Sequence, residues 1–188
     1  KNKSVHFLGL LSNGGVHSHI DHLKALIKAA QESGVEKSYV HAFTDGRDVD
    51  PKSGKGFLID LDHFCSDKNT KLATVVGRYY AMDRDKRWER VKLAYDVMVN
   101  AQGEKVQDIG KAMQESYDEG ITDEFIKPLV MTNANGEPLG QIAEGDVIIF
   151  FNFRTDRGRE LTQALSQQDF HEQNMHKMDL YYVTMTNY

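Results

Sequence analysis

The sequence has 188 residues, 40% of them hydrophobic, with a formal net charge of −5 and a pI of about 5.9. This length suits one compact domain, and the acidic balance argues against nucleic acids and anionic membranes as partners, because both attract basic surfaces. The sequence shows no membrane-spanning run, no secretory signal and only one cysteine, Cys65, so we expect a cytoplasmic protein without disulfides.

Apolar runs alternate with amphipathic stretches along the chain. In chain order, the sequence predicts a strand at 5–11, a helix at 20–33, a strand at 39–43, a helix at 56–66, a strand at 72–76, helices at 86–100 and 106–119, a strand at 147–151, a helix at 158–166 and a strand at 180–185. Residues 125–141 carry an Asn135-Gly136 hairpin signal and are expected to be antiparallel or irregular. We therefore predict one α/β domain over residues 1–188, a three-layer α/β/α sandwich with a mostly parallel sheet.

The arginines fall in three short stretches, whereas the lysines are scattered. The stretches hold Arg47; Arg78, Arg84, Arg87 and Arg90; and Arg154, Arg157 and Arg159. Arginine grips carboxylates and phosphates through a planar fork of donors, so clustered arginines on an acidic chain indicate a small anionic ligand. Arg87 and Arg90 lie at helical spacing beside Glu89 and are interpreted as surface charges.

Four polar clusters follow four of the predicted strands, at residues 12–19, 44–51, 77–85 and 152–158. The carboxyl ends of parallel strands share one edge of the sheet, where α/β proteins bind ligands. Taken singly, Asp45 could only stabilise a turn, and Asp83 and Asp156 could only cap helices. Gathered cations repel each other without an anionic partner, so the four clusters together predict a ligand with at least two anionic groups and a hydroxyl.

Individual side chains in these clusters suit that ligand. His17 follows two glycines, whose backbone amides can approach an anion. Arg47 can hold an anion while its neighbour Asp48 accepts a hydroxyl proton. Arg154 and Arg157 are three residues apart at a predicted helix start, so they are expected to form one anion clamp.

A zinc site is an alternative, because His17, His19, Asp21 and His22 match the H-x-H-x-D-H pattern of metallo-β-lactamase-like hydrolases. Such a site needs further ligands from later strand ends, yet the other histidines fall mostly within predicted strands or helices or near a terminus. A stand-alone module that binds a phosphorylated metabolite is a third hypothesis.

Four motifs, at 14–19, 44–48, 77–85 and 151–157, occur in the order in which they resemble 2,3-bisphosphoglycerate-independent phosphoglycerate mutases. Thr155 departs from the Pro expected in many relatives. The resemblance implies a substrate-binding domain for 3-phosphoglycerate and 2-phosphoglycerate, inserted in an alkaline-phosphatase-like domain that carries two Mn²⁺ ions and a serine nucleophile. The motifs of that second domain are missing here, so we expect an excised fragment, inactive alone and without its own metal.

The resemblance also implies which residues contact substrate: His17, Arg47, Asp48, Arg78, Arg84, Arg154 and Arg157. Asp48 would be the catalytic proton shuttle for the glycerate hydroxyls. The missing domain would take the phosphoryl group while this domain retains the glycerate, a contribution of proximity. The arginines that bind carboxylate and those that bind phosphate are not distinguished.

Overall fold

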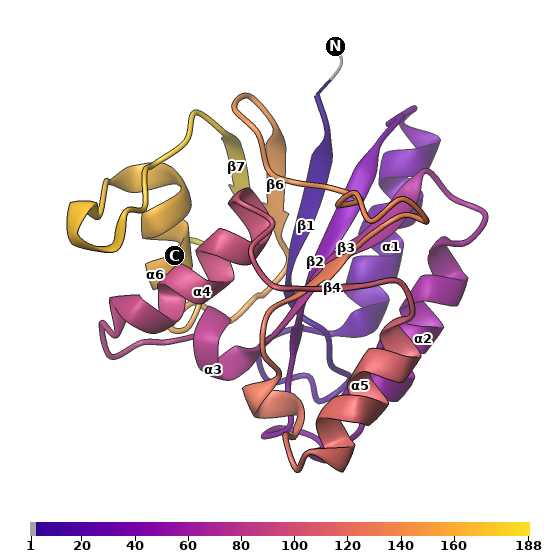
Figure 1. Ribbon diagram of the computed structural model, residues 1–188. Coiled ribbons are helices and arrows are strands. Elements are labelled where there is room, and N and C mark those ends of the chain that lie inside the picture. The colour runs from indigo at the N-terminus through magenta and orange to yellow at the C-terminus, as the bar shows by residue number, and fades with distance from the viewer. Residues whose placement is uncertain (1–2) are drawn as a thin grey trace.

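The computed structural model describes residues 3–188, which form a sheet of seven strands (Figure 1). The strands are β1 (Val5–Leu10), β2 (Ser38–Thr44), β3 (Thr70–Gly77), β4 (Glu104–Val106), β5 (Leu129–Met131), β6 (Val147–Phe150) and β7 (Tyr181–Thr184). Their order across the sheet is β4-β5-β3-β2-β1-β6-β7, and only the pairing of β3 with β5 is antiparallel. The predicted mostly parallel sheet is confirmed.

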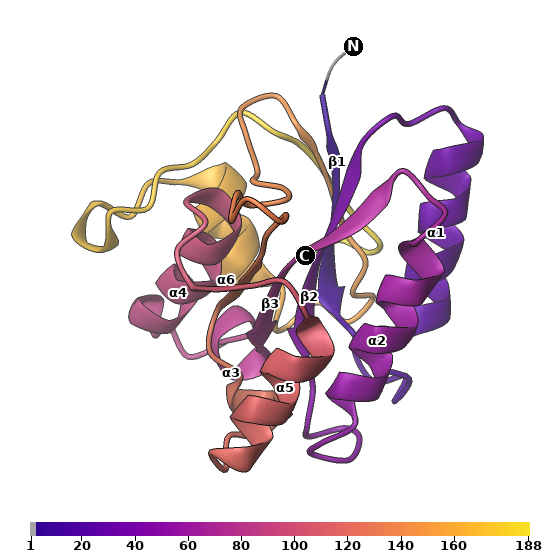
Figure 2. The same cartoon turned by 45° about the vertical axis from the view of Figure 1, so that its right-hand side comes forward.

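Helices lie on both sides of the sheet, as Figure 2 shows. They are α1 (Ile20–Glu32), α2 (Gly54–Cys65), α3 (Arg78–Ala81), α4 (Trp88–Val99), α5 (Ile109–Asp118) and α6 (Arg159–Thr162), with a π-helix η2 (Gln163–Gln167) and 3₁₀ turns η1 (Asp123–Phe125) and η3 (His171–Gln173). α1, α2 and α5 pack on one face and α4 and α6 on the other, so the three-layer α/β/α sandwich is confirmed. Among the described residues, no helix has the length and apolarity needed to cross a membrane.

Strand residues alternate between two hydrophobic cores, because successive side chains of a strand point to opposite faces. Phe7 of β1 lies in the core beneath α1 and α2, whereas its neighbour Leu8 lies in the core beneath α4 and α6. Both side chains are fully buried, and each such burial contributes roughly 1.5–3 kcal/mol. Burial on both faces explains why the sequence of β1 is continuously apolar.

The structure departs from prediction between α4 and β6. The helix expected at 106–119 begins only at Ile109, because the Asp108 side chain caps it by accepting a hydrogen bond from the Lys111 N–H at 2.9 Å. The residues before this cap form the short strand β4, which pairs with β5. The antiparallel pairing of β5 with β3 confirms the expected irregular part of the sheet.

The carboxyl ends of β1, β2, β3 and β6 lie together at one edge of the sheet, the lower edge in Figure 1. Two glycines allow η1 to approach this edge closely. A Cβ atom on Gly77 would lie 2.3 Å from the carbonyl oxygen of Glu124, and one on Gly46 would lie 2.8 Å from the Glu124 nitrogen. Gly46 also has a φ of +69°, which side-chain-bearing residues rarely adopt. Both positions require glycine for η1 to pack here.

Candidate functional site

Arg78 is the centre of a buried network at this edge. It is the first residue of α3, directly after β3, and only 3% of its surface is exposed. Its Nη1 donates to Asp45 Oδ1 at 2.6 Å and to Asp48 Oδ2 at 2.7 Å, and its Nη2 lies 3.1 Å from His17 Nε2. One guanidinium group therefore ties the loops after β1 and β2 to the end of β3.

Asp45 fixes the geometry of the loop that carries Asp48. Its Oδ1 accepts hydrogen bonds from the backbone N–H groups of Arg47 and Asp48, both at 3.1 Å. Burial acts to raise the pKa of Asp45, but the backbone hydrogen bond and the bond from Arg78 outweigh it and hold the pKa below its usual value. The Arg78–Asp45 pair is therefore ionised and positioned before any ligand binds.

The contact with Arg78 defines the protonation of His17. A guanidinium group has no acceptor, so His17 Nε2 must accept, and the neutral ring carries its proton on Nδ1. Burial, followed by the charge of Arg78, lowers the pKa of His17 and favours this neutral form. The Nδ1 atom is buried without a hydrogen-bond partner in the described part of the chain, and Asp156 Oδ1 lies 3.9 Å away. An unpaired buried donor costs about 1–3 kcal/mol, which a ligand oxygen at this position would recover.

A second network lies beside the first, in the loop after β6. Asp156 accepts hydrogen bonds from Arg154 Nε at 2.9 Å and from Arg84 Nη1 at 3.0 Å. Burial acts to raise the pKa of Asp156, but the hydrogen bond from Arg84 and the charge of Arg154 lower it overall. The guanidinium side chains of Arg84 and Arg154 are each 49% exposed, so they are held at the surface by one carboxylate that offsets only part of their charge.

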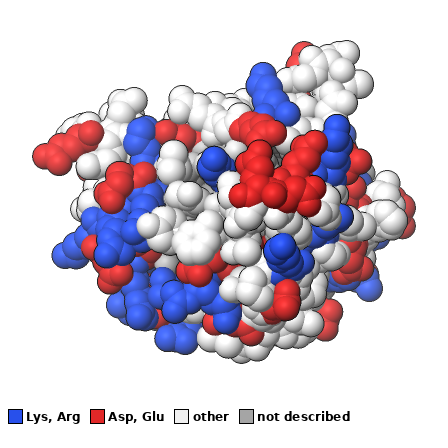
Figure 3. Space-filling view, turned by 60° about the horizontal axis from the view of Figure 1, so that its bottom comes forward, with Lys and Arg blue, Asp and Glu red and all other residues white. Residues whose placement is uncertain are grey.

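A hollow of about 210 Å³ opens next to Arg78. It is lined by Arg47, Arg78, Tyr79, Asp83, Asp85, Arg87, Arg90, Glu124, Phe125 and Arg157. Arg157 donates to the carbonyl oxygen of Met82 at 2.9 Å, and burial, followed by the positive charges of Arg84 and Arg78, lowers the pKa of Arg157. Positive charge therefore converges at this edge, and Figure 3 shows Lys and Arg side chains gathered on the corresponding face.

The cation beside Asp48 is not its sequence neighbour Arg47. Arg47 does not pair with Asp48, because its side chain is half exposed and lies 3.5 Å from a carboxylate oxygen of Glu124. The cation that holds Asp48 is Arg78, which approaches from a different strand. Arg90, interpreted as a surface charge, instead lies over the Tyr79 ring, 3.8 Å from its centroid, and lines the hollow.

Arg154 and Arg157, predicted to form one anion clamp at a helix start, lie before that helix. α6 begins at Arg159, so both residues lie in the turn before it, and their side chains engage different partners. Arg154 joins Arg84 through Asp156, whereas Arg157 borders the hollow with Arg78. That all of these arginines bind the ligand stays a prediction.

Two acidic residues belong to the site although the sequence assigned them to turns and caps. Asp45 does stabilise its turn, but it also anchors Arg78, and Asp156 bridges Arg84 and Arg154. The arginine clusters gave a hint that counter-charges were needed. Asp45 and Arg78 are 33 residues apart, a separation across which pairing is not readable from one sequence.

The zinc hypothesis is not favoured. In the described part of the chain, no group of three or more His, Cys, Asp or Glu side chains could hold a metal ion. His19 instead caps α1 by accepting a hydrogen bond from the Asp21 N–H at 3.2 Å, and His22 packs against the Phe153 ring. His17 directs its Nε2 at a guanidinium group, whose charge opposes cation binding.

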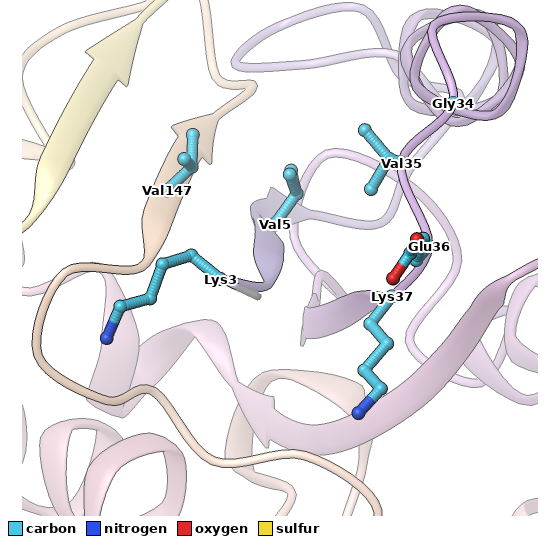
Figure 4. A pocket seen from close by; sticks show the side chains of 7 residues that line it. All are labelled: Lys3, Val5, Gly34, Val35, Glu36, Lys37 and Val147. Atoms are coloured by element: carbon cyan, nitrogen blue, oxygen red, sulfur yellow. The ribbon is translucent and has the colours of Figure 1, made fainter. Parts of the chain in front are cut away.

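A larger hollow of about 670 Å³ lies at the opposite edge of the sheet and contains none of these residues. Figure 4 shows the side chains that line it: Lys3, Val5, Gly34, Val35, Glu36, Lys37 and Val147. Three valines and a glycine line it together with Lys3, Glu36 and Lys37, so its wall is about as polar as it is apolar. It offers none of the convergent donors found at the carboxyl edge, which is therefore the candidate ligand site.

Comparison with known proteins identifies the family to which this chain belongs. A family model described as the BPG-independent PGAM N-terminus (iPGM_N) matches residues 1–188. The chain is 65% identical over 187 residues to the 2,3-bisphosphoglycerate-independent phosphoglycerate mutase of Flavobacterium johnsoniae, covering 100% of this chain and 37% of that protein. The identity is 58% to the protein of the same name from Bacteroides thetaiotaomicron, covering 99% of this chain and 36% of that protein.

The fold agrees with a solved structure. The crystal structure of phosphoglycerate mutase from Leishmania mexicana at low cobalt concentration matches with a TM-score of 0.93 and 29% identity, over 100% of this chain and 36% of that one. The chain thus spans a little over a third of the length of its relatives. It belongs to the 2,3-bisphosphoglycerate-independent phosphoglycerate mutase family, in the part described as the N-terminus.

Proposed function

We propose that this chain is the substrate-binding domain of a cytoplasmic phosphoglycerate mutase that interconverts 3-phosphoglycerate and 2-phosphoglycerate. The observation that carries the proposal is the Nδ1 atom of His17, which is buried beside Arg78 and has no hydrogen-bond partner within residues 3–188. Phosphoglycerate offers a phosphate, a carboxylate and a hydroxyl, which is the chemistry that such donors select. The names of the relatives support the same substrate.

Substrate binding and phosphoryl transfer would be carried out by different parts of the polypeptide. The described residues bind and orient the glycerate, while the remainder of the polypeptide moves the phosphoryl group. That remainder would hold two Mn²⁺ ions, which supply phosphoryl-transfer chemistry, and the serine nucleophile. No metal is assigned to residues 3–188, because Asp45, Asp48 and Asp156 are already engaged by arginines.

Asp48 is proposed as the proton acceptor for the glycerate hydroxyls. Its Oδ2 is held by Arg78 at 2.7 Å and lies 3.9 Å from His17 Nε2, while 18% of the side chain stays exposed to the site. A carboxylate in a fixed position that a ligand can reach is suited to general base catalysis. This domain would also keep the glycerate bound and present its other hydroxyl to the phosphoryl group. Holding the two reacting groups close together would accelerate the transfer.

Two substitutions of His17 test the proposal by calorimetric titration of the full-length protein with 3-phosphoglycerate. His17→Gln retains a polar group near Nε2 but removes the donor at Nδ1, so affinity should fall about tenfold or more. His17→Asn places an amide nitrogen near Nδ1 and should bind more tightly than His17→Gln. His63→Gln, an exposed change on α2, is the control. Equal affinity of His17→Gln and the parent protein would contradict the proposal.

A further inference from the structure

One part of the sheet has an exposed apolar face, over β6 and β7. Tyr182 of β7 packs into the core beneath α4 and α6, so its neighbours Tyr181 and Val183 point to the opposite face. Tyr181 is 71% exposed, Val183 38% and Met185, two residues further along, 44%. Large apolar side chains at alternate positions of an edge strand indicate a face that another element covers.

The register of β6 extends this face inward. Val147 is the strand partner of Tyr181, and Ile149 is the partner of Val183. Val147 and Ile149 pack against the core beneath α1, but each is only partly buried. The apolar strip is therefore two strands wide and continuous with the hydrophobic core.

α1 forms one wall beside this strip. Lys24 contacts Asp60 of α2 at 2.6 Å, which shows the side of α1 that faces α2. Helical periodicity places Leu26 and His22 on the other side, toward β6. The His22 ring accordingly packs against Phe153, which follows β6, with centroids 5.9 Å apart. The strip is thus a slot bounded by α1.

The slot leads into the larger hollow at the amino edge, since Val147 lines both. Figure 4 shows Val5, Val35 and Val147 around the open space, with Lys3, Lys37 and one acidic residue, Glu36, nearby. Two neighbouring strands span about 10 Å, and an α-helix with its side chains is about 10–12 Å across. The slot therefore has the width of one helix packed alongside α1.

We propose that a helix of the full-length polypeptide, from the part outside these 188 residues, occupies this slot. Its apolar face would pack on Val147, Ile149 and Val183, and acidic side chains at one end would meet Lys3 and Lys37. The relatives are long enough to contain such a helix, because the matched region is only 37% of the length of the Flavobacterium johnsoniae protein. A segment of the same polypeptide is present at high effective concentration, which favours it over a second copy. The covered strip would complete the two-faced burial that parallel strands ordinarily have.

Cysteine labelling of the full-length protein tests this proposal. Val183→Cys probes the slot, while Leu93→Cys on α4 and Ile59→Cys on α2 probe exposed apolar positions on the two helical layers, with exposures of 42% and 36%. Native Cys65 gives little background, since it is buried and burial raises its pKa to about 11. We expect the cysteine at 183 to react with a maleimide at least roughly tenfold more slowly than both controls. Reaction as fast as either control would overturn the proposal.

A second measurement needs no substitution. Hydroxyl-radical oxidation of the wild-type full-length protein should leave Met185 and Tyr181 protected, and they should become reactive only on unfolding. Rapid oxidation of both residues in the folded protein would overturn the proposal, and so would protection that disappears on dilution, because a second copy would then be the occupant. Neither result bears on the His17 titration, so the ligand site and the slot are tested separately.

Discussion

Two buried polar networks, one within the sheet and one at its carboxyl edge, differ in how completely they are bonded. In the first, His6 Nε2 lies 3.1 Å from Asp146 Oδ2, His6 Nδ1 lies 2.9 Å from His41 Nε2, and His41 Nδ1 lies 2.8 Å from Thr74 Oγ1. None of these atoms is among the buried polar atoms that lack a partner in residues 3–188. This network joins β1, β2, β3 and the residue preceding β6, and it has no remaining capacity for a ligand.

The network around Arg78, by contrast, is open, because some of its buried polar atoms lack partners. His17 Nδ1 and Asp45 Oδ2 are buried and have no hydrogen-bond partner in the part of the chain that the structure describes. Both networks contain buried histidine and aspartate, so residue type does not separate them. Unused bonding capacity at the carboxyl edge does, and it marks the network around Arg78 as the candidate ligand site.

The largest expected effect comes from removing the cation of the open network. Arg78→Ala should lower the free energy of unfolding by about 3–5 kcal/mol, because Asp45 would be left buried without its counter-charge. Urea unfolding of the 188-residue chain measures it. Arg154→Ala is the matched control and should cost less than about 1 kcal/mol, since Arg154 is half exposed. Equal losses in the two variants would show that the Arg78 network is not specially coupled.

Asp48→Asn should separate chemistry from binding in the open network. In the full-length protein we expect kcat to fall by about 100-fold or more, because the amide retains the shape but not the basicity of the carboxylate. The Kd for 3-phosphoglycerate should change little. Asp50→Asn, an exposed change in the same loop, is the control. Near-normal turnover by Asp48→Asn would remove this residue from the mechanism.

The closed network should respond to pH rather than to ligand. Burial lowers the pKa of His6, and burial together with the neighbouring His6 lowers that of His41. As pH falls below about 6.5, the unfolded chain takes up protons before the native one, so stability present above that pH is lost by up to about 1.4 kcal/mol per pH unit for each histidine.

Unfolding of the parent and of His41→Gln at pH 7.5, 6.5 and 5.5 isolates this contribution, since His17, whose pKa is also lowered, is common to both. The parent should lose stability more steeply than the variant across this range. Identical slopes would mean that the His6–His41 pair does not control the response to acid.

The smallest effect, on ligand affinity, is expected for Arg154 and Arg157, the arginines at the outer rim of the candidate site. Arg154→Lys and Arg157→Lys should each weaken 3-phosphoglycerate binding about tenfold, because lysine keeps the charge but loses the bidentate fork. Arg159→Lys is the control, an exposed arginine two residues beyond Arg157. If all three variants bind like the parent, the rim arginines do not contact substrate.

The sequence was sufficient for the main layers of the fold. Long strands such as β1 and β2 are apolar on both faces, and α1 and α5 carry clear amphipathic periodicity. The strand β4 was missed because three residues carry too little pattern to separate a strand from the start of the following helix. Its position is fixed by pairing with β5, a contact across the chain that local propensity does not encode.

The candidate site was predictable as a location but not as a set of pairs. Parallel topology brings the four polar loops to one edge, so His17, Asp48 and Arg78 were expected to be neighbours. The pairing of Asp48 with Arg78 instead of Arg47 depends on how α3 emerges from β3. The geometry of α3 in turn depends on residues 123–126, which are distant in sequence.

The close approach of η1 to Gly77 and Gly46 has a consequence for how the site tolerates genetic change. Neither glycine carries a functional group, yet a single methyl group at position 77 would collide with the Glu124 backbone and displace the start of α3. Arg78, the next residue, would move with it. The candidate ligand site therefore depends on the empty space at position 77 as much as on charged side chains. Gly77→Ala adds only a methyl group, yet it should impair the site by displacing Arg78.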